Sequence, residues 1–447
     1  MKLFPSALAT VLLCTLLWGC SDDDDDSPTD TPDPNTPTAQ LRAVHLSPDG
    51  PAVDISVNGA VALEDVTYRQ ASGFLSVPSG DTPVQVLVAD TDTAVIDATL
   101  TLAEDQNYTV LAVNVVDAIE PLVIEDDGTA PASGSAALRV VHAAPNAPEV
   151  DVYVSGPADD FAGLSPLLQS VPFKAVADEL EVPAGDYRVR VTLAGQSDIV
   201  YDSGTLTLAD GVEYVAVASQ VDGLTSPIGL TLLTDIADTP VALADDARAR
   251  LRAVHASPDA PAVDISVDSA EVLSDVPFGV ASDYLLLLGG TYNIDVSAAD
   301  GSASVINADI PLAAGVDYTL AAVNFLSEIS PLLLEDDNAL PADGNVKLRL
   351  VHAAPSAPTV DVYLTAPDTD IADALPSIAA FNFAENTGYI EAPAGTYRVR
   401  VTVANTKTVA IDTGALTLEA GQIRTAFALD PSHSGGDFGV LLLEDRN

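Results

Sequence analysis

The chain has 447 residues, and its 66 acidic and 17 basic residues give a formal net charge of −49 at pH 7. This charge argues against binding to nucleic acid or anionic lipid by simple attraction, because phosphate groups would be repelled. The length suggests about three or four domains, and a hydrophobic content of 48% is enough for a globular body. A solvated acidic surface is the favoured interpretation of the charge, and a surface that collects divalent cations is the alternative.

The first twenty residues, MKLFPSALATVLLCTLLWGC, predict export. The apolar run from Ala7 to Trp18 is shorter than the roughly 20 residues that a membrane-spanning helix needs, and it follows Lys2 as in a secretory signal peptide. Its end, LWGC, resembles a bacterial lipobox, which implies cleavage before Cys20 and acylation of the Cys20 thiol. We therefore expect a lipoprotein signal peptide at 1–19. An ordinary signal peptide with an incidental cysteine is the alternative.

Residues 20–40 follow as an acidic, Pro/Thr-rich stretch that is too charged to fold and is expected to form a disordered tether. Cys14 and Cys20 are the two cysteines of the chain, so the mature protein would have neither a disulfide nor a free thiol. Ser21 after Cys20 resembles an outer-membrane sorting signal, and the acidic run resembles surface-export signals of some lineages. We expect an outer-membrane lipoprotein, held to the membrane by acylated Cys20 and facing the periplasm or the cell surface.

One motif occurs four times after the tether, first as LRAVHLSPDGPAVDISV. The copies define unit 1 (41–127), unit 2 (138–235), unit 3 (251–337) and unit 4 (348–445). Leu251 follows Leu41, and Leu348 follows Leu138, by 210 residues, which favours duplication of a two-unit block. The intervening stretches GTAPASGSAA, IADTPVALADDARAR and NALPADGNVK are rich in small residues, Pro and acids, and we interpret them as linkers.

Within each unit apolar and polar residues alternate with a period of two, as in AVDISV and YRVRVTL, and turn sequences such as PSGD and PAGD separate the runs. About seven short strands per unit predict an all-β fold, with four tandem antiparallel β-sandwich domains of immunoglobulin- or transthyretin-like type. Units 2 and 4 carry an insertion after the second strand, around PADDFAGLSPLLQSVPF and PDTDIADALPSIAAFNF. We expect each insertion to form a longer loop with one helical turn.

Three features together resemble the bacterial domain of unknown function 4397. They are the opening LRxVHxxPxxPxVDxxV, a Gly-Tyr-type turn before a strand, and a closing PLxxEDD. All four units match the opening, so the resemblance covers nearly the whole chain after the tether. The turn is degraded to GDTPV in unit 1, and the closing acids are reduced to LLTD in unit 2. The resemblance implies an exported β-rich domain and carries over no catalytic residue.

The motif histidine recurs as His45, His142, His255 and His352. Alternation places it on the core side of the first strand, near the end of that strand. We expect a structural histidine that hydrogen-bonds loop backbone and stabilises the proline-rich turn. A metal ligand is the alternative, although one histidine per unit is too few for a transition-metal site without further ligands.

An arginine and an aspartate recur twelve residues apart in every unit, as Arg42 and Asp54, Arg139 and Asp151, Arg252 and Asp264, and Arg349 and Asp361. If the two strands form a hairpin, each pair meets across it as an ion pair worth about 0–1 kcal/mol when exposed. Anion capture by the arginine is the functional alternative. Two further pairs, Arg188 with Arg190 and Arg398 with Arg400, share a strand face, and we expect them to pair within the chain rather than with an anionic partner.

Calcium is the one cofactor that the acidic runs suggest, at residues 125–127 and 335–337. Solvated acids are favoured instead, because neighbouring side chains on a strand point to opposite faces and no EF-hand-type loop occurs. The chain also lacks nucleophile-elbow, zinc-protease and phosphate-loop motifs. We therefore expect no enzyme but a binding, adhesion or envelope-scaffold protein, with a protein or surface polymer as partner and no nucleic acid. An exported hydrolase or its accessory subunit, with a site in the loops of units 2 and 4, is the alternative.

Overall fold

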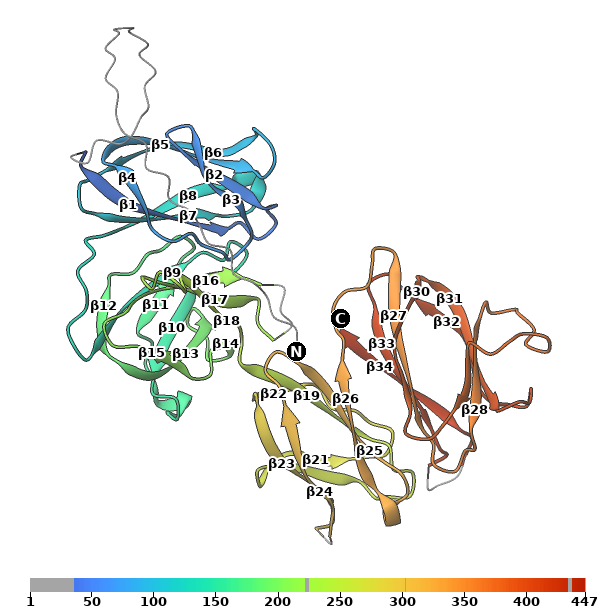
Figure 1. The fold of residues 1–447 in the computed structure, drawn as a ribbon. Helices are drawn as coiled ribbons and strands as arrows, with labels where there is room; N and C mark the ends of the chain where they lie inside the picture. The colour runs from blue at the N-terminus through green and yellow to red at the C-terminus, as the bar shows by residue number, and fades with distance from the viewer. Residues whose placement is uncertain (1–35, 222–224, 302, 433–435, 447) are drawn as a thin grey trace, which may run out of the picture.

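The computed structural model describes residues 36–221, 225–301, 303–432 and 436–446 (Figure 1). In these ranges the regular elements are β-strands and three single-turn 3-10 helices. No helix of the described ranges is long and apolar enough to cross a membrane. The signal peptide predicted at 1–19, and Cys20 with it, lie outside the described residues.

The strands follow one another in the same order in every unit. Unit 1 contains β1 (Thr38–Leu46), β2 (Val53–Val57), β3 (Ala60–Val66), β4 (Leu75–Pro78), β5 (Gly80–Val88), β6 (Ala94–Leu102), β7 (Asn107–Val113), η1 (Val116–Ala118) and β8 (Glu120–Asp126). Unit 2 contains β9 (Ser135–His142), β10 (Val150–Ser155), η2 (Phe161–Gly163), β11 (Leu168–Val171), β12 (Leu180–Pro183), β13 (Gly185–Leu193), β14 (Ile199–Asp202), β15 (Leu206–Leu208), β16 (Glu213–Gln220), β17 (Ile228–Thr234) and β18 (Val241–Ala244). Unit 3 contains β19 (Arg248–His255), β20 (Val263–Val267), β21 (Ala270–Val276), β22 (Leu285–Leu288), β23 (Gly290–Ala298), β24 (Ser304–Leu312), β25 (Asp317–Val323), η3 (Leu326–Glu328) and β26 (Ser330–Asp336). Unit 4 contains β27 (Asn345–Ala353), β28 (Val360–Thr365), β29 (Ile378–Phe381), β30 (Asn386–Pro393), β31 (Gly395–Val403), β32 (Val409–Leu418), β33 (Ile423–Leu429) and β34 (Gly439–Arg446).

Each unit is a two-sheet sandwich, as the alternation predicts. The sheet that holds the first strand, here called the motif sheet, has the order β4-β1-β7-β8 in unit 1. The sheet that holds the second strand, here called the outer sheet, has the order β3-β2-β5-β6. Units 3 and 4 repeat both orders, while unit 2 adds β18 to its motif sheet and β15 to its outer sheet. The first and second strands therefore lie in different sheets and form no hairpin.

One strand pair in each motif sheet corrects the expectation of a purely antiparallel sandwich. In unit 1 the first strand, β1, runs parallel to β7, and the same holds for β9 with β16, β19 with β25 and β27 with β33. Gln40 lies beside Asn107, and Asn107 lies beside Asp126. The start of the first strand of unit 1 and the end of its last strand therefore lie at the same end of the motif sheet, in one row of residues.

Two local predictions need correction. The stretch interpreted as the linker between units 2 and 3 contains β18, which pairs antiparallel with β17, because its alternating Val241 and Leu243 extend the sheet. The insertion of unit 2 contains the expected helical turn, η2, which Asp160 caps by accepting from the backbone amide of Ala162. Among the described residues of unit 4, the insertion forms a loop without a helical turn.

The units pack in two face-to-face pairs through their motif sheets (Figure 1). In the first pair, Val44 and Leu111 of unit 1 share one buried cluster with Val217 and Leu233 of unit 2. The second pair is built alike from units 3 and 4. Each motif sheet is consequently buried on both faces, one against its own outer sheet and one against the neighbouring unit. Every residue of β25 is buried for this reason, a pattern more usual for the central strands of parallel sheets.

Candidate functional site

The motif histidines hold the proline-rich turn in three of the four units. His45 Nε2 lies 2.9 Å from the carbonyl oxygen of Pro51, and the Ser47 amide donates to His45 Nδ1 at 3.3 Å. His142 and His255 repeat both contacts. Because Nδ1 accepts, Nε2 carries the proton and donates to the proline carbonyl. Both ring nitrogens are thus engaged with backbone, and burial lowers the pKa of these three histidines, which favours the neutral ring.

The motif aspartates bind backbone amides instead of the motif arginines. Asp54 accepts from the amide of Asp65 at 2.9 Å, and Asp151 accepts from the amide of Ser170 at 2.7 Å. Both donors have positive φ, of 55° and 48°, a conformation that L-residues adopt reluctantly. Asp264 and Asp361 do the same in units 3 and 4. The hairpin ion pair predicted between each arginine and aspartate is therefore wrong, because the two residues lie in different sheets.

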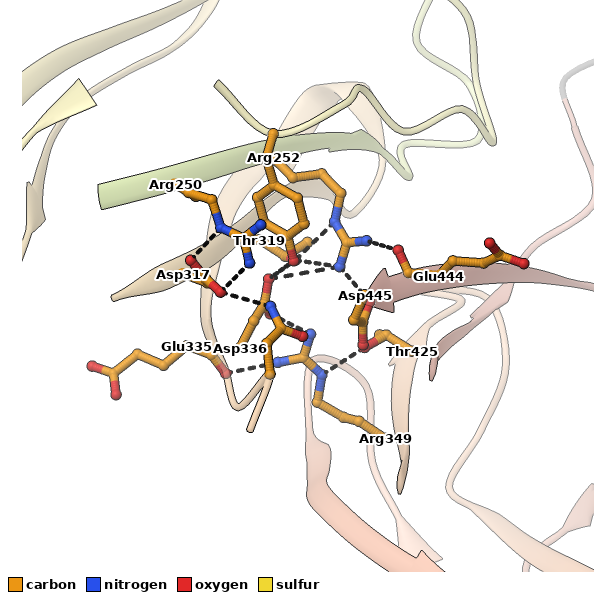
Figure 2. Close-up of polar contacts among 12 residues, drawn as sticks. Arg250, Arg252, Asp317, Thr319, Glu335, Asp336, Arg349, Thr425, Glu444 and Asp445 are labelled. Carbon is orange, nitrogen blue, oxygen red and sulfur yellow. Dashed lines mark hydrogen bonds and ion pairs between the residues drawn. The ribbon is translucent and has the colours of Figure 1, made fainter. Parts of the chain in front are cut away.

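The motif arginines reach across the pair interface (Figure 2). Arg252 of unit 3 donates from Nη2 to Asp445 of unit 4 at 2.6 Å. Arg349 of unit 4 donates from Nη2 to Asp336 of unit 3 at 2.5 Å. Each guanidinium also donates from Nη1 to a backbone carbonyl of the other unit, at 3.3 Å and 2.9 Å. The pair thus has approximate two-fold symmetry, with each motif arginine bound to the last strand of its neighbour.

Each of these aspartates is also bound by side chains of its own unit. Asp336 accepts from Thr319 Oγ1 at 2.7 Å and from Tyr284 Oη at 2.6 Å. Asp445 accepts from Thr425 Oγ1 at 2.5 Å and from Tyr389 Oη at 2.8 Å. The two tyrosine rings lie beneath the guanidinium groups, at 4.8 Å and 4.6 Å from ring centre to Cζ. We call these eight residues, including Arg252 and Arg349, the arginine cluster, a buried ionic network with its hydrogen bonds made.

Two acids of the run at 335–337, where a calcium site was considered, are bound by other side chains of the protein. Asp336, the central acid of the run at 335–337, uses both carboxylate oxygens on Arg349, Thr319 and Tyr284. Asp337, its neighbour, pairs with Lys347 at 2.8 Å. Across the residues that the structure describes, no group of three or more His, Cys, Asp or Glu side chains could hold a metal ion.

The corresponding site between units 1 and 2 is looser. Arg42 donates to the carbonyl oxygen of Thr234 at 2.7 Å, but Arg139 lies 3.6 Å from Asp126 and 3.3 Å from Glu179. Unit 2 has Val215 at the position of Thr319 and Glu179 at that of Tyr284. Arg139 Nε is accordingly buried without a hydrogen-bond partner in the described structure.

The looser site concentrates negative charge around Glu213 of β16. Burial first, and then the nearby carboxylates of Asp126, Asp235 and Glu179, raise the pKa of this carboxyl to about 7 against an opposing effect of Arg42. A raised carboxyl pKa means that the folded state favours the protonated form.

Glu213→Gln is expected to flatten the pH dependence of stability in the first pair. In wild type, the protonated Glu213 carboxyl contributes to the free energy of unfolding. This contribution is fully present below the unfolded-state pKa near 4.5 and is lost as the pH rises through about 7. The variant should therefore be more stable than wild type at pH 8 and similar at pH 4.5. Urea unfolding at both pH values measures this difference. Glu181→Gln, on an exposed position of the same unit, is the control, and equal slopes for all three proteins would contradict the assignment.

The remaining paired arginines act within their own units, as expected. Arg188 pairs with Asp202 at 2.5 Å, and Arg398 pairs with Asp412 at 2.5 Å. Arg190 donates to Ser155 Oγ and to the carbonyl oxygen of Asp159. Arg400 makes the same two kinds of contact in unit 4. Arg190 and Arg400 thereby hold the insertions against their own sandwiches.

Sequence reasoning missed the threonines and tyrosines of the arginine cluster. Their signal was present, since Thr109, Thr319 and Thr425 share one position of the repeat. Phe74, Tyr284 and Tyr389 share another, and each ring lies beneath a motif arginine. Comparing the units position by position would have found both sets.

Comparisons with known proteins give limited guidance. No curated protein matches the sequence significantly. Among solved structures, the chain is similar to the Bacillus anthracis TIE protein, with 12% identity, coverage of 86% of this chain and 67% of that one, and a TM-score of 0.16. It is also similar to a product complex of SpuA, a multi-modular glycogen-degrading pneumococcal virulence factor, with 8% identity, coverage of 84% and 38%, and a TM-score of 0.15.

A protein-family match covers most of the chain. The matched residues are 39–153, 249–363 and 365–447. The first two matches begin in the motif strands of units 1 and 3 and run into the second strands of units 2 and 4. The chain therefore belongs to the family described as Domain of unknown function (DUF4397).

Proposed function

We propose that the protein is a non-catalytic lipoprotein of the outer membrane that displays its two unit pairs for binding, adhesion or envelope scaffolding. The observation that supports this role is the use of the repeated polar residues. The histidines bind turns, the aspartates bind backbone amides, and the arginines join one unit to the next. Residues repeated in all four units thus build the scaffold, which leaves the exposed surface to contact a partner.

The pairing of units supports a binding role in a second way. Two similar blocks on one chain present similar surfaces twice, and linked binding modules can raise weak affinities about 100- to 10,000-fold when both engage. The net charge of −49 favours a neutral or cationic partner over nucleic acid. We propose a protein or a surface polymer as that partner.

Protease treatment of intact cells, with a Cys20→Ala variant beside wild type, tests the location. We expect wild type to stay with the outer membrane and the variant to appear in the soluble fraction, because the variant lacks the acylated thiol. Retention of Cys20→Ala in the membrane would refute the lipid anchor. Digestion in intact cells would place the units on the surface, and protection until the outer membrane is broken would place them in the periplasm.

A further inference from the structure

The strands β8, β17, β26 and β34 occupy the same place in the motif sheets of the four units. Among the described residues, β8, β26 and β34 each pair with one strand and lie at the edge of their sheet, whereas β17 pairs with both β16 and β18 (Figure 1). β18 comes from the segment between units 2 and 3, and it runs antiparallel to β17 opposite residues 230–233. Unit 2 thus shows how a short additional strand is accepted at this place.

One position of these four strands distinguishes the units. It lies opposite an alanine of the preceding strand, and it is Pro121 in unit 1, Leu230 in unit 2, Pro331 in unit 3 and Val440 in unit 4. A proline has no backbone N–H, so it makes the edge of a sheet a poor place for a further strand. Leu230, which has an N–H, lies opposite Ala244 of β18. Unit 4 therefore has the kind of residue found at the covered edge, at an edge that no described strand covers.

The exposure of β34 agrees with a missing neighbour. Leu230 is 3% exposed, whereas Val440 is 38% exposed. In unit 2, Val241 of β18 packs on the cluster shared with unit 1, and Ala244 packs on the core of unit 2 itself. An added strand on β34 would likewise have one face toward the cluster shared with unit 3 and the other toward the core of unit 4.

The end of β18 is held by a residue that the second pair lacks. Arg69 of unit 1 pairs with Asp245, which follows β18, at 2.6 Å, and it donates to the carbonyl oxygen of Leu230 at 2.9 Å. Gly279 takes the place of Arg69 in unit 3, since the amide of each donates to the carbonyl oxygen of the motif histidine. A segment with acidic residues after its strand would therefore find no equivalent arginine beside β34.

The ends of the uncovered part of β34 are acidic instead. Asp437 precedes the strand and Glu444 lies near its end, and both are exposed. Unit 2 has the uncharged Pro227 and Thr234 at these positions. Although Glu444 pairs with Arg424, basic residues at both ends of an added strand would lie beside a carboxylate, which favours a cationic segment.

We propose that β34 binds an extended segment of a partner protein, which adds an antiparallel strand opposite residues 440–443. The segment is apolar, like β18, and has lysine or arginine at its ends. In this mode of recognition the backbone hydrogen bonds supply affinity and the side chains supply specificity. The net charge of −49 disfavours a second copy of this chain as the occupant. The inference gives the proposed binding role a class of partner and rests on that role.

Binding of a labelled peptide tests this proposal. The probe is a fluorescein-labelled KPVALAKK amide, which places the VALA sequence of β18 between lysines, and the protein is the purified full chain carrying Cys20→Ala. We expect saturable binding by fluorescence anisotropy. Val440→Pro should weaken it about tenfold or more, because the protein loses one donor and a peptide carbonyl is left unpaired. Absence of binding to the parent chain, or equal binding to Val440→Pro, would overturn the proposal.

Two controls make this test specific. Val440→Thr retains the backbone N–H and should bind the peptide as the parent chain does. Val440→Pro should unfold at nearly the parent melting temperature, because Pro121 and Pro331 occupy the same position in folded units. The acidic peptide DPVALADD should bind more weakly than the lysine peptide, and equal binding of the two would refute the preference for a cationic segment.

Amide hydrogen exchange and sedimentation identify other occupants. The peptide should slow exchange in β34 and leave β8 and β26 unchanged. Slow exchange at Val440 before peptide is added would show that another part of this chain already covers the edge. A parent chain that sediments as a dimer, and as a monomer with Val440→Pro, would place a second copy there. Either result would overturn the assignment to a partner protein. Neither depends on the membrane location, so failure of this site is distinguishable from failure of the display role.

Discussion

Asp336→Ala is expected to lower the free energy of unfolding of the second pair by about 3–5 kcal/mol, because it breaks a buried ion pair and leaves one charge without its partner. The Asp336 side chain is fully buried and faces Arg349, whose guanidinium is almost fully buried as well. Thr319 and Tyr284 lose their acceptor at the same time. Urea unfolding followed by circular dichroism measures the effect.

Two further variants make this prediction specific. Asp126→Ala alters the equivalent residue of unit 1, whose partner Arg139 lies 3.6 Å away and also contacts Glu179, so a loss of about 0–1 kcal/mol is expected. The double change Asp336→Leu with Arg349→Met removes both charges and should recover most of the lost stability. Equal losses from Asp336→Ala and Asp126→Ala would show that the two pairs do not differ as described.

Phe427→Ala is expected to destabilise the second pair by about 3–5 kcal/mol, as large-to-small changes in a packed core do. The ring is completely buried between the motif sheets of units 3 and 4, in one cluster with Val254, Val323 and Val351. Because that cluster belongs to both units, the cavity left by the ring should loosen β25 of unit 3 as well as β33 of unit 4.

Amide hydrogen exchange distinguishes this shared effect from a local one. We expect faster exchange in both β25 and β33 after Phe427→Ala. Leu375→Ala, at a position that is 88% exposed in unit 4, should leave both strands unchanged. Faster exchange confined to β33 would mean that the two units are stabilised independently.

Much of the sandwich could be predicted from the sequence because its signals are local. Alternation in AVDISV places Val53 and Ile55 in the core, and the histidine near the end of the first strand binds the adjacent turn. The parallel pairing of β1 with β7 could not be predicted in this way. A period of two reports which face a side chain occupies, and it contains no information on which distant strand lies alongside.

The partners of the motif arginines were hidden by distance along the chain. Arg252 and Asp445 are separated by 193 residues, and the sequence around either residue does not identify the other as its partner. The second buried face of the motif sheet was hidden for the same reason, since Val44 packs on a unit that begins only after the linker. Alternation with the core residues Leu41 and Ala43 places Val44 on the face away from the core of unit 1, and it gives no sign that unit 2 covers that face.

The placement of both ends of unit 1 in one row of the motif sheet determines how the protein would respond to mechanical load. A force that pulls Gln40 and Asp126 apart would break the hydrogen bonds between the strands one row after another from that end, and not all of them at once. Unit 3 has the same register, with Arg250, Asp317 and Asp336 in its end row. Asp336 is also the residue that Arg349 fastens to unit 4. The arginine cluster therefore joins units 3 and 4 at the end of the sheet where the strands would begin to separate. The first pair, with its looser site, should unfold at a lower force than the second.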